Sequence, residues 1–382
     1  MADTPNIRFK GFSDNWVRQK LGEISSSYSG GTPKVGKSEY YGGAIPFIRS
    51  GEIAADKTEL FITEDGFKNS SAAMVEEGNI LYALYGATSG EVSRAKLKGA
   101  INQAILAIIP NPGYNAEYLM QWLRNKKQFI INTYLQGGQG NLSGAIVKDL
   151  MVDIPGTAEQ KMIGAFLNNV DQLIILHQCK CDEIRKLKKY MMKKMFPRNG
   201  KKIPQIRFAG FTDNWEQRKL GDEATGIIAG GDIDRDLILE KGRYPVIANS
   251  LTNDGIVGYY NSEFRVKAPA VTITGRGDVG HARARNIDFT PVVRLLSVKS
   301  DHDVFFLENA INTLHIAIES TGVPQLTVPQ LAKYELFFPK TLEEEKEIGR
   351  YFCRFDQLIT LHQCKCNELK EFKKFMLKNI FP

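Results

Sequence analysis

Apolar side chains recur at helical spacing through two long segments of the chain, residues 158–200 and 342–382. In both segments one set of positions recurs every seven residues, and further apolar residues stand three positions after members of that set. Sustained heptads of this kind predict two long helices that pack on each other. The alternative is that each helix packs only on its own domain. The predicted helix-pair interface consists of Ile163, Val170, Leu173, His177, Ile184, Leu187 and Met191 in the first helix, and Ile348, Phe355, Leu358, His362, Leu369, Phe372 and Met376 in the second.

The rest of the chain alternates short apolar runs with turn residues. Runs at 44–49, 78–86, 101–110, 243–250, 268–275 and 291–298 are separated by glycine, proline and asparagine, which is typical of strands in a β-rich domain. Short helices are predicted at 116–135 and 308–319. The predicted fold is therefore α+β, with a β-rich head before each long helix. The heads are residues 1–157 and 201–341, and the helices are 158–200 and 342–382.

A long internal repeat organises these parts. IRFKGFSDNWVRQKLGE at residues 7–23 returns as IRFAGFTDNWEQRKLGD at 206–222, with 11 of 17 positions identical. Residues 159–197 return at 344–382 with 21 of 39 positions identical. The segments between, 24–158 and 223–343, barely match. A repeat of this length is two whole domains with a shared frame and different contents, because solenoid repeats have far shorter periods.

Composition narrows the class of protein. The chain has 382 residues, enough for two or three domains, and a formal net charge of +7, which favours a polyanionic partner. It has no apolar run long enough to cross a bilayer and no apolar signal core at the N-terminus, so we expect a cytoplasmic protein without a membrane partner. The five cysteines include two C-x-C pairs, which is not a disulfide framework and predicts reduced thiols.

The segment GGTPKVGKS, residues 30–38, matches the phosphate-loop pattern at Gly31, Gly36, Lys37 and Ser38. A phosphate loop needs a buried strand before it and a helix after it. The preceding EISSSYSG is too polar for a buried parallel strand, and the glycines and proline of EYYGGAIPF leave no room for a helix. We therefore interpret the match as coincidental. Catalytic signatures such as H-E-x-x-H and G-x-S-x-G are also missing from the sequence, so we expect no catalytic residue and no enzyme activity in this chain.

The pentapeptide HQCKC occurs once in each long helix. If the helices cross at their midpoints, His177, Cys181, His362 and Cys366 could form a tetrahedral zinc site. The other interpretation is a polar heptad position that fixes the register of the helices. No metal is predicted.

Two dissimilar segments, each followed by a near-identical long helix, resemble the specificity subunit of type I restriction-modification systems. The phrases IRFKGFSDNW, YYGGAIPFIRSGEI and GAINQAILAI resemble its target recognition domains, and EQKMIGAFLNNVDQLIILHQCK resembles its repeated helices. The resemblance implies two heads on an antiparallel coiled coil with pseudo-twofold symmetry, each head recognising one half of a bipartite, asymmetric DNA site. Each long helix, taken as about 37 residues, would be about 55 Å long, since a helix rises about 1.5 Å per residue.

The same resemblance implies partners. The helices would dock two modification subunits, which would carry S-adenosylmethionine and methylate adenine, and restriction subunits would join them. The S-adenosylmethionine, ATP and magnesium of the complex are expected in those subunits, and no cofactor is expected in this chain. The alternative function is a non-enzymatic coiled-coil scaffold that bridges two protein ligands.

Arginine, asparagine and glutamine can pair with base edges, and lysine mainly holds phosphate. Candidate contacts to double-stranded DNA in head 1 are Lys34, Lys37, Arg49, Ser50, Tyr85, Thr88, Ser89, Arg94, Gln139 and Asn141. Those in head 2 are Asn249, Ser250, Thr274, Arg276, His281, Arg283, Arg285 and Gln325. The run 180–202 carries ten lysines and arginines against two acids; it is interpreted either as a cover for DNA phosphates or as a partner surface.

Overall fold

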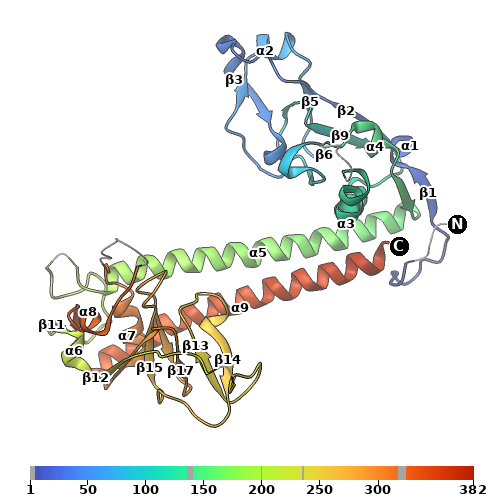
Figure 1. Ribbon diagram of the computed structural model, residues 1–382. Coiled ribbons are helices and arrows are strands. Elements are labelled where there is room, and N and C mark those ends of the chain that lie inside the picture. Colours follow the sequence, from blue (N-terminus) through green and yellow to red (C-terminus); the bar gives the residue numbers. More distant parts are fainter. Residues whose placement is uncertain (1–4, 136–140, 199, 235, 317–323) are drawn as a thin grey trace. The chain divides into compact units, whose positions relative to one another are not determined.

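The computed structural model describes residues 5–135, 141–198, 200–234, 236–316 and 324–382. They form two compact units. Unit 1 comprises residues 1–177 and 365–382, and unit 2 comprises residues 178–364. Each unit contains a β-rich head and half of each long helix, α5 (Thr157–Met195) and α9 (Leu342–Ile380), which are the two predicted helices (Figure 1).

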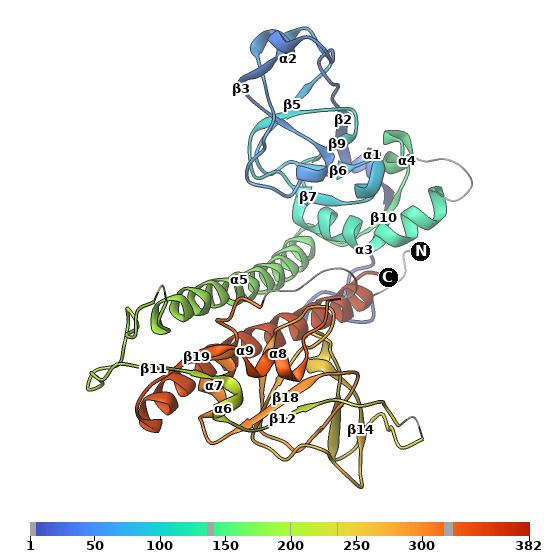
Figure 2. The ribbon, with the colours of Figure 1, turned by 60° about the vertical axis from the view of Figure 1, so that its left-hand side comes forward.

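Head 1 holds two four-stranded sheets and a two-stranded ribbon (Figure 2). The antiparallel sheet has the order β2 (Ser25–Ser29), β9 (Ile105–Pro110), β6 (Ile80–Ala83), β7 (Val92–Arg94). The second sheet has the order β4 (Phe61–Ile62), β3 (Tyr41–Ile48), β8 (Gly99–Ile101), β5 (Ala73–Val75), and the ribbon pairs β1 (Val17–Lys20) with β10 (Met151–Ile154). Its helices are α1 (Leu21–Ile24), α2 (Glu64–Lys68), α3 (Ala116–Tyr134) and α4 (Gly144–Lys148), with 3₁₀ turns η1 (Ser38–Tyr40), η2 (Ser50–Glu52) and η3 (Gly86–Thr88).

Head 2 has the same kinds of element. Its antiparallel sheet has the order β12 (Ala224–Ala229), β18 (Leu296–Ser300), β15 (Ala270–Ile273), β16 (Ala282–Arg285). A second sheet has the order β14 (Ile256–Tyr260), β13 (Tyr244–Ile247), β17 (Thr290–Pro291), and a ribbon pairs β11 (Glu216–Lys219) with β19 (Glu335–Phe338). Its helices are α6 (Leu220–Glu223), α7 (Val304–Ile311) and α8 (Val328–Ala332), with the 3₁₀ turn η4 (Asn253–Gly255).

The two heads share one topology although their sequences barely match. The order β2-β9-β6-β7 of head 1 corresponds to β12-β18-β15-β16 of head 2, and the parallel pair β3–β8 corresponds to β13–β17. The predicted α+β class, the six predicted strand regions and the helix at 116–135 are confirmed. The helix predicted at 308–319 was wrong at both ends. It begins earlier, because Asp303 accepts hydrogen bonds from the amides of Phe305 and Phe306 and so caps α7, and it ends at Ile311; residues 317–319 lie outside the described residues.

The repeated IRF and DNW phrases have a structural reason. The Arg8 guanidinium donates two hydrogen bonds of 2.8 Å to Glu159, which lies near the start of α5 and is 1% exposed. Arg207 makes the same fork to Glu344 of α9, at 2.7 and 2.8 Å. Two parallel N–H···O bonds fix both distance and orientation. The segment that opens each unit is therefore fastened to the helix that follows its head.

Each hydrophobic core runs from a head into both long helices. The core of unit 1 joins Trp16 and Tyr118 of head 1 to Leu167 of α5 and Ile380 of α9. The core of unit 2 joins Trp215 and Phe306 of head 2 to Met195 of α5 and to Phe352 of α9. Because these side chains are almost fully buried, each head is packed on its helices and not hung from a flexible linker.

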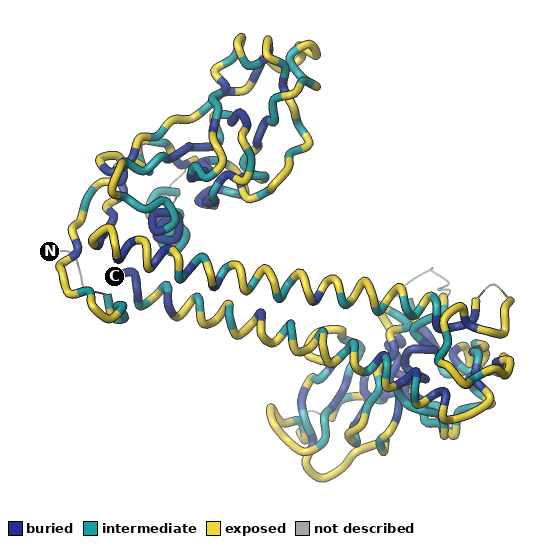
Figure 3. The backbone as a smooth tube through the Cα atoms, turned by 180° about the vertical axis from the view of Figure 1, so that it is seen from behind, coloured by how far each residue is buried: buried dark blue, intermediate teal, exposed yellow. Residues whose placement is uncertain are grey.

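The helices pair antiparallel within each unit, with the first half of α5 against the second half of α9 in unit 1 and the reverse in unit 2 (Figure 3). Asp171 of α5 accepts hydrogen bonds from Lys373 of α9 at 2.6 and 2.8 Å. The equivalent pair in unit 2, Asp356 and Lys188, lies at 2.7 Å. The predicted packing of the helices on each other is thus present, and the alternative of two separately packed helices is wrong.

Of the two heptad positions predicted to form the interface between the long helices, one was wrong. Ile163, Val170, Ile348 and Met376 are buried as expected, and His177, Ile184, Met191, Phe355, His362 and Leu369 are partly buried. The positions three residues later are not: Leu173, Leu187, Leu358 and Phe372 are 44%, 49%, 45% and 43% exposed. The seam instead uses positions four residues later, such as Leu167, Cys181 and Cys366. The positions three and four residues later are both rich in apolar residues. The apolar stripe in the sequence is therefore wider than the surface that the partner helix covers.

The cysteine repeats belong to this seam. The thiol of Cys181 lies 3.8 Å from the carbonyl oxygen of Ile359, and that of Cys366 lies 4.0 Å from the carbonyl oxygen of Ile174. Within the described part of the chain, no group of three or more histidine, cysteine, aspartate or glutamate side chains could hold a metal ion. These contacts favour a packing role for the buried cysteine of each repeat.

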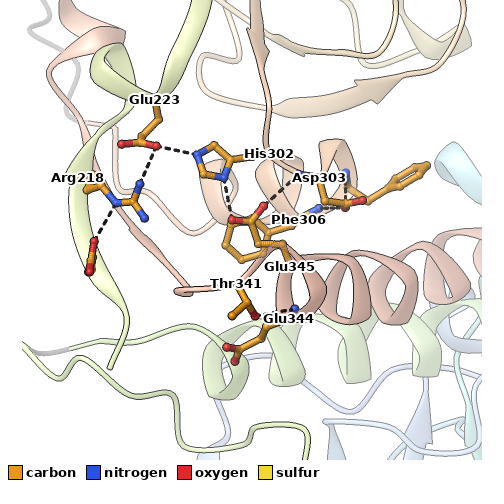
Figure 4. Close-up of polar contacts among 10 residues, drawn as sticks. Arg218, Glu223, His302, Asp303, Phe306, Thr341, Glu344 and Glu345 are labelled. Carbon is orange, nitrogen blue, oxygen red and sulfur yellow. Dashed lines mark hydrogen bonds and ion pairs between the residues drawn. The ribbon is translucent and has the colours of Figure 1, made fainter. Parts of the chain in front are cut away.

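A cluster of ionisable groups joins head 2 to α9 (Figure 4). His302 lies between two carboxylates, with its Nδ1 2.7 Å from Glu345 and its Nε2 2.8 Å from Glu223, and Glu223 also accepts from Arg218 at 2.9 Å. Burial alone would lower the pKa of His302, but the hydrogen bonds to Glu345 and Glu223 raise it above its ordinary 6.5. Burial likewise opposes the shift at Glu223, whose pKa is lowered by His302 and Arg218.

Candidate nucleic-acid interface

Three loops occupy equivalent places in the two heads. They are the hairpin between β6 and β7 or β15 and β16, the segment after β3 or β13, and the segment before α4 or α8. Backbone hydrogen bonds tie the last segment to the hairpin in both heads, from the amide of Leu142 to Leu84 (3.0 Å) and from that of Leu326 to Gly275 (2.8 Å). These loops contain the candidates Arg49, Ser50, Tyr85, Thr88, Ser89 and Asn141 of head 1 and Asn249, Ser250, Thr274, Arg276, His281 and Gln325 of head 2. Gln139 lies outside the described residues.

Several head 1 candidates use their polar groups inside the head. The Ser89 hydroxyl is buried and donates to the carbonyl of Leu84 at 3.2 Å, and Thr88 donates to that of Tyr85 at 3.4 Å. Tyr85 packs partly against the head core. The Arg94 guanidinium donates to the Gly78 carbonyl and lies 3.6 Å from Glu117. These contacts stabilise the loops and leave the polar groups less available to bind bases.

Cationic candidates of head 1 lie at the surface. Arg49 is 49% exposed and donates to Glu52 at 2.6 Å, and this hydrogen bond is the main cause that lowers the pKa of Glu52 to about 2. Ser50 is partly buried beside it, and Asn141 is exposed. Lys34 and Lys37 are exposed between β2 and β3. The region after Lys37 is the three-residue turn η1 followed by β3, so the helix that a phosphate loop requires is not present at this place.

In head 2 three candidates hold the loops together. Asn249 accepts from the amide of Gly275 at 2.7 Å and donates to the carbonyl of Val293. Thr274 donates to the carbonyl of Asp278 and accepts from the amide of His281 at 2.9 Å. Ser250 exchanges a hydrogen bond of 2.9 Å with the hydroxyl of Thr252. Two other candidates face outward together, because Arg276 and Gln325 form an antiparallel bridge and both are exposed.

A cavity of about 440 Å³ opens between the loops of head 2 and the second half of α5. It gathers five candidates, Ser250, Thr274, His281, Arg283 and Arg285. Asp254 holds the two arginines, at 3.1 Å from Arg283 and 3.0 Å from Arg285. Burial lowers the pKa of Arg285, while Arg283 remains 52% exposed and available to a ligand. The cavity wall is therefore rich in basic side chains, and Asp254 neutralises part of their charge.

The cavity also contains residues that were not among the candidates. Three of them, Arg185, Lys188 and Lys189 of α5, belong to the basic run 180–202, and the charge of that run could have pointed to them. Glu308 of α7 and Asn312, the residue that follows α7, lie on its wall as well, and nothing in their sequence neighbourhood pointed to them. Their places follow from the packing of α7 beside the edge strand β16, where Asn312 exchanges hydrogen bonds with the backbone of Ala282 at 2.9 and 3.0 Å.

The fold and the paired loops define a two-headed protein with a helix pair, and comparisons place it in a family. The model of the type I restriction modification DNA specificity domain matches residues 13–186 and again 212–371. The chain therefore belongs to this family and is of the type I specificity-subunit class. The MjaIX specificity subunit of Methanocaldococcus jannaschii is 26% identical over 61% of this chain and 57% of its own, and the MjaVIII subunit of that organism is 23% identical over 94% and 91%.

Solved structures agree in fold. The type I restriction-modification S subunit from M. genitalium has a TM-score of 0.72 at 14% identity and covers 100% of this chain and 99% of its own. In three of the matched relatives the aligned part spans only 64%, 43% and 57% of the relative's length. None of the described helices combines the length and the apolar character that a membrane span would need.

Proposed function

We propose that this chain recognises a bipartite DNA site, with one half-site bound by each head. The observation that carries the proposal is that the two heads share a topology while their equivalent loops hold different side chains. A common frame supports the same approach to the duplex, and different loops select different bases. The continuous helices, 39 residues each and thus about 58 Å long, are proposed to set the unread gap between the half-sites.

The proposal is tested by exchanging one head. Residues 24–158 are replaced by the matching segment of another specificity subunit, and methylated adenines are mapped in DNA from cells that carry the whole complex. We expect only one half of the methylated site to change. A change in both halves, or in neither, would contradict recognition by separate heads. Equal affinity for DNA and for an unrelated polyanion would favour the alternative, a scaffold that bridges two protein ligands.

Two exposed side chains separate base contacts from phosphate contacts. Arg276 stands on the hairpin of head 2, and we expect Arg276→Ala to cost about 1–3 kcal/mol and to relax preference at one base position. Lys37→Ala in head 1 should weaken binding to all sequences alike and reduce the salt slope by about 1. Titrations of the assembled complex at several salt concentrations measure both effects. Loss on every DNA for both variants would contradict the assignment.

We further propose that the helix pair docks two modification subunits, which carry S-adenosylmethionine and the methyl-transfer chemistry, with ATP and magnesium in restriction subunits. This chain would then be non-catalytic. Support comes from apolar side chains exposed at the same positions of both repeats. Unit 1 exposes Leu173, Leu176, Phe372 and Phe375, and unit 2 exposes their counterparts Leu358, Leu361, Leu187 and Tyr190, all between 43% and 56%. Exposed apolar groups that cluster in this way mark a protein interface.

The docking proposal predicts one partner for each unit. Phe375→Asp should remove one modification subunit and Tyr190→Asp the other, and the double variant should bind neither. Native mass spectrometry of the assembled complex counts the bound subunits. Thr360→Ala, at an exposed polar position of α9 outside the basic run, is the control and should leave both bound. Retention of two subunits by the double variant would contradict this docking surface.

A further inference from the structure

A buried carboxylate lies in the wall of the basic cavity of head 2. Glu308 of α7 is only 5% exposed, yet it belongs to the cavity wall together with the α5 cations Arg185, Lys188 and Lys189. A carboxylate that leaves water is costly unless it is paired. A charge of this sign in a basic cavity is therefore a feature that needs an explanation.

Two of the cations near Glu308 are paired with other carboxylates. Lys188 is held by Asp356 of α9 at 2.7 Å, and Arg283 is held by Asp254 at 3.1 Å. Among the described residues, no lysine or arginine forms an ion pair with Glu308, and the backbone of Ala284 in β16 only partly offsets the rise in its pKa. Burial, helped by Asp356, raises the pKa of Glu308 to about 7, against the opposing effect of Lys188, Arg283 and the Ala284 amide. The carboxyl group thus keeps acceptor capacity for a ligand in the cavity.

Head 1 shows that the frame does not require this carboxylate. In head 2, Asn312 holds the edge strand β16 at Ala282, and in head 1 Arg124 of α3 holds the equivalent strand β7 at Val92, at 3.1 Å. Four residues before these two anchors stand Glu308 and Met120. Met120 is 3% exposed and lies in the core of unit 1. The same place can be filled by an apolar side chain, so the glutamate is a specific property of head 2.

We propose that Glu308 is a specificity-determining residue of head 2, whose carboxylate accepts a hydrogen bond from the exocyclic amino group of a cytosine in the second half-site. This inference rests on the proposed function. A carboxylate repels phosphates and the acceptor edges of guanine and thymine, and among base edges it pairs with the N4 amino group of cytosine. Arg185, Lys189 and the exposed Arg283 line the same cavity and would hold the neighbouring phosphates.

The test measures base preference, with a library of duplexes randomised in both half-sites and the complete complex. For Glu308→Gln, preference for cytosine at one position should fall about 5- to 150-fold, since one good pairing contributes about 1–3 kcal/mol. Adenine should gain at that position, because a glutamine amide pairs with adenine. The other half-site should not change. In the wild type, cytosine preference should rise from pH 6 to pH 8 as Glu308 ionises, and in Glu308→Gln this dependence should vanish.

A matched control lies in head 1. Glu117 is a part-buried carboxylate that is already paired, with Arg94 at 3.6 Å and with the side-chain amide of Gln121 at 3.0 Å, so Glu117→Gln should leave all base preferences unchanged. If Glu308→Gln misfolds, Glu308→Met takes its place, because head 1 folds with methionine there. Unchanged preference at every position in a folded variant, or a wild-type preference independent of pH, would overturn the inference alone. A wild-type complex without any bipartite preference would instead overturn the proposed function.

Discussion

At one junction between head and long helix, unit 1 uses neutral polar groups, whereas unit 2 has ionisable groups at the same places. The amide of Asn115 donates to the side chain of Gln160 at 2.9 Å, and at the equivalent place the amide of Asp303 donates to Glu345 at 3.0 Å. Next to these, Tyr114 donates to Gln19 at 3.0 Å in unit 1, where unit 2 has the cluster of His302 described above.

This difference teaches what a repeated frame conserves. An amide oxygen and a carboxylate oxygen can both accept the same backbone hydrogen bond, so either residue preserves the geometry. What changes is the charge, and with it the response to pH. The two junctions therefore have the same shape and different electrostatics, and substitutions can show where the equivalence ends.

The largest expected effect is at the forks that fasten each opening segment. Arg8→Ala leaves Glu159 buried without its counter-ion, which should cost about 3–5 kcal/mol in unit 1. Arg207→Ala should cost less, because the indole of Trp215 still donates to Glu344 at 3.2 Å, while the indole N–H of Trp16 has no partner among the described residues. Hydrogen exchange of β1–β10 and β11–β19 in the full chain reports the two losses separately.

The control for this pair is an exposed ion pair of the same ribbon. Lys20 and Asp149 lie 2.9 Å apart with half or more of each side chain exposed, so solvent screens the pair and Lys20→Ala should have a much smaller effect than Arg8→Ala. If Arg8→Ala were as mild as Lys20→Ala, the buried fork would not be what holds the opening segment. Equal losses for Arg8→Ala and Arg207→Ala would show that the indole hydrogen bond contributes little.

A smaller effect is expected between the helices. Asp171 accepts from Lys373, from Arg124 at 3.0 Å and from the side chain of Gln121 at 2.8 Å, whereas Asp356 accepts from Lys188. Asp171→Asn should therefore destabilise its unit by about 1 kcal/mol more than Asp356→Asn, the usual size for a hydrogen bond or two. Denaturant unfolding followed by hydrogen exchange in each unit measures the difference. Glu183→Gln, at an exposed position of α5, should change neither unit.

The sequence predicts those features of the structure that depend on residues close together in the chain. The long helices and most strands could be predicted, because periodicity and turn residues act over a few positions. The seam was assigned to Leu173 and Leu187, since the sequence shows an apolar stripe but does not show how far its partner covers it. The structure turns those side chains outward and leaves them about half exposed.

The candidate interface shows the same limit. The three kinds of loop could be found from their residue types, and the structure gives them equivalent places in both heads. The sequence could not predict which of these side chains remain free to contact DNA. Thr274 forms a hydrogen bond across a turn, and Asn249 forms one to a residue distant in sequence. Glu308 was invisible for the opposite reason: it stands in a short apolar helix, and only the packing of α7 beside β16 brings it to the cavity.

The smallest effect, and the one most specific to the comparison, concerns pH. The folded-state pKa of His302 lies above 6.5, so its protonated form stabilises the junction fully below about pH 6.5, and this contribution disappears as pH rises through the raised pKa. Glu223 has a lowered pKa, so its contribution is present above about pH 4.5 and disappears as pH falls through the lowered value.

Exchange protection of β11–β19 should therefore be greatest in the mildly acidic range and should decline on the alkaline side. Unit 1 has Tyr114 and Gln19 at this place and no histidine, so β1–β10 should show no such decline. In His302→Gln the alkaline decline should vanish from unit 2 as well, because a glutamine amide cannot gain the proton that draws Glu223 and Glu345 together. A decline of equal size in both units would mean that the pH response belongs to the shared frame and not to the charges that distinguish unit 2.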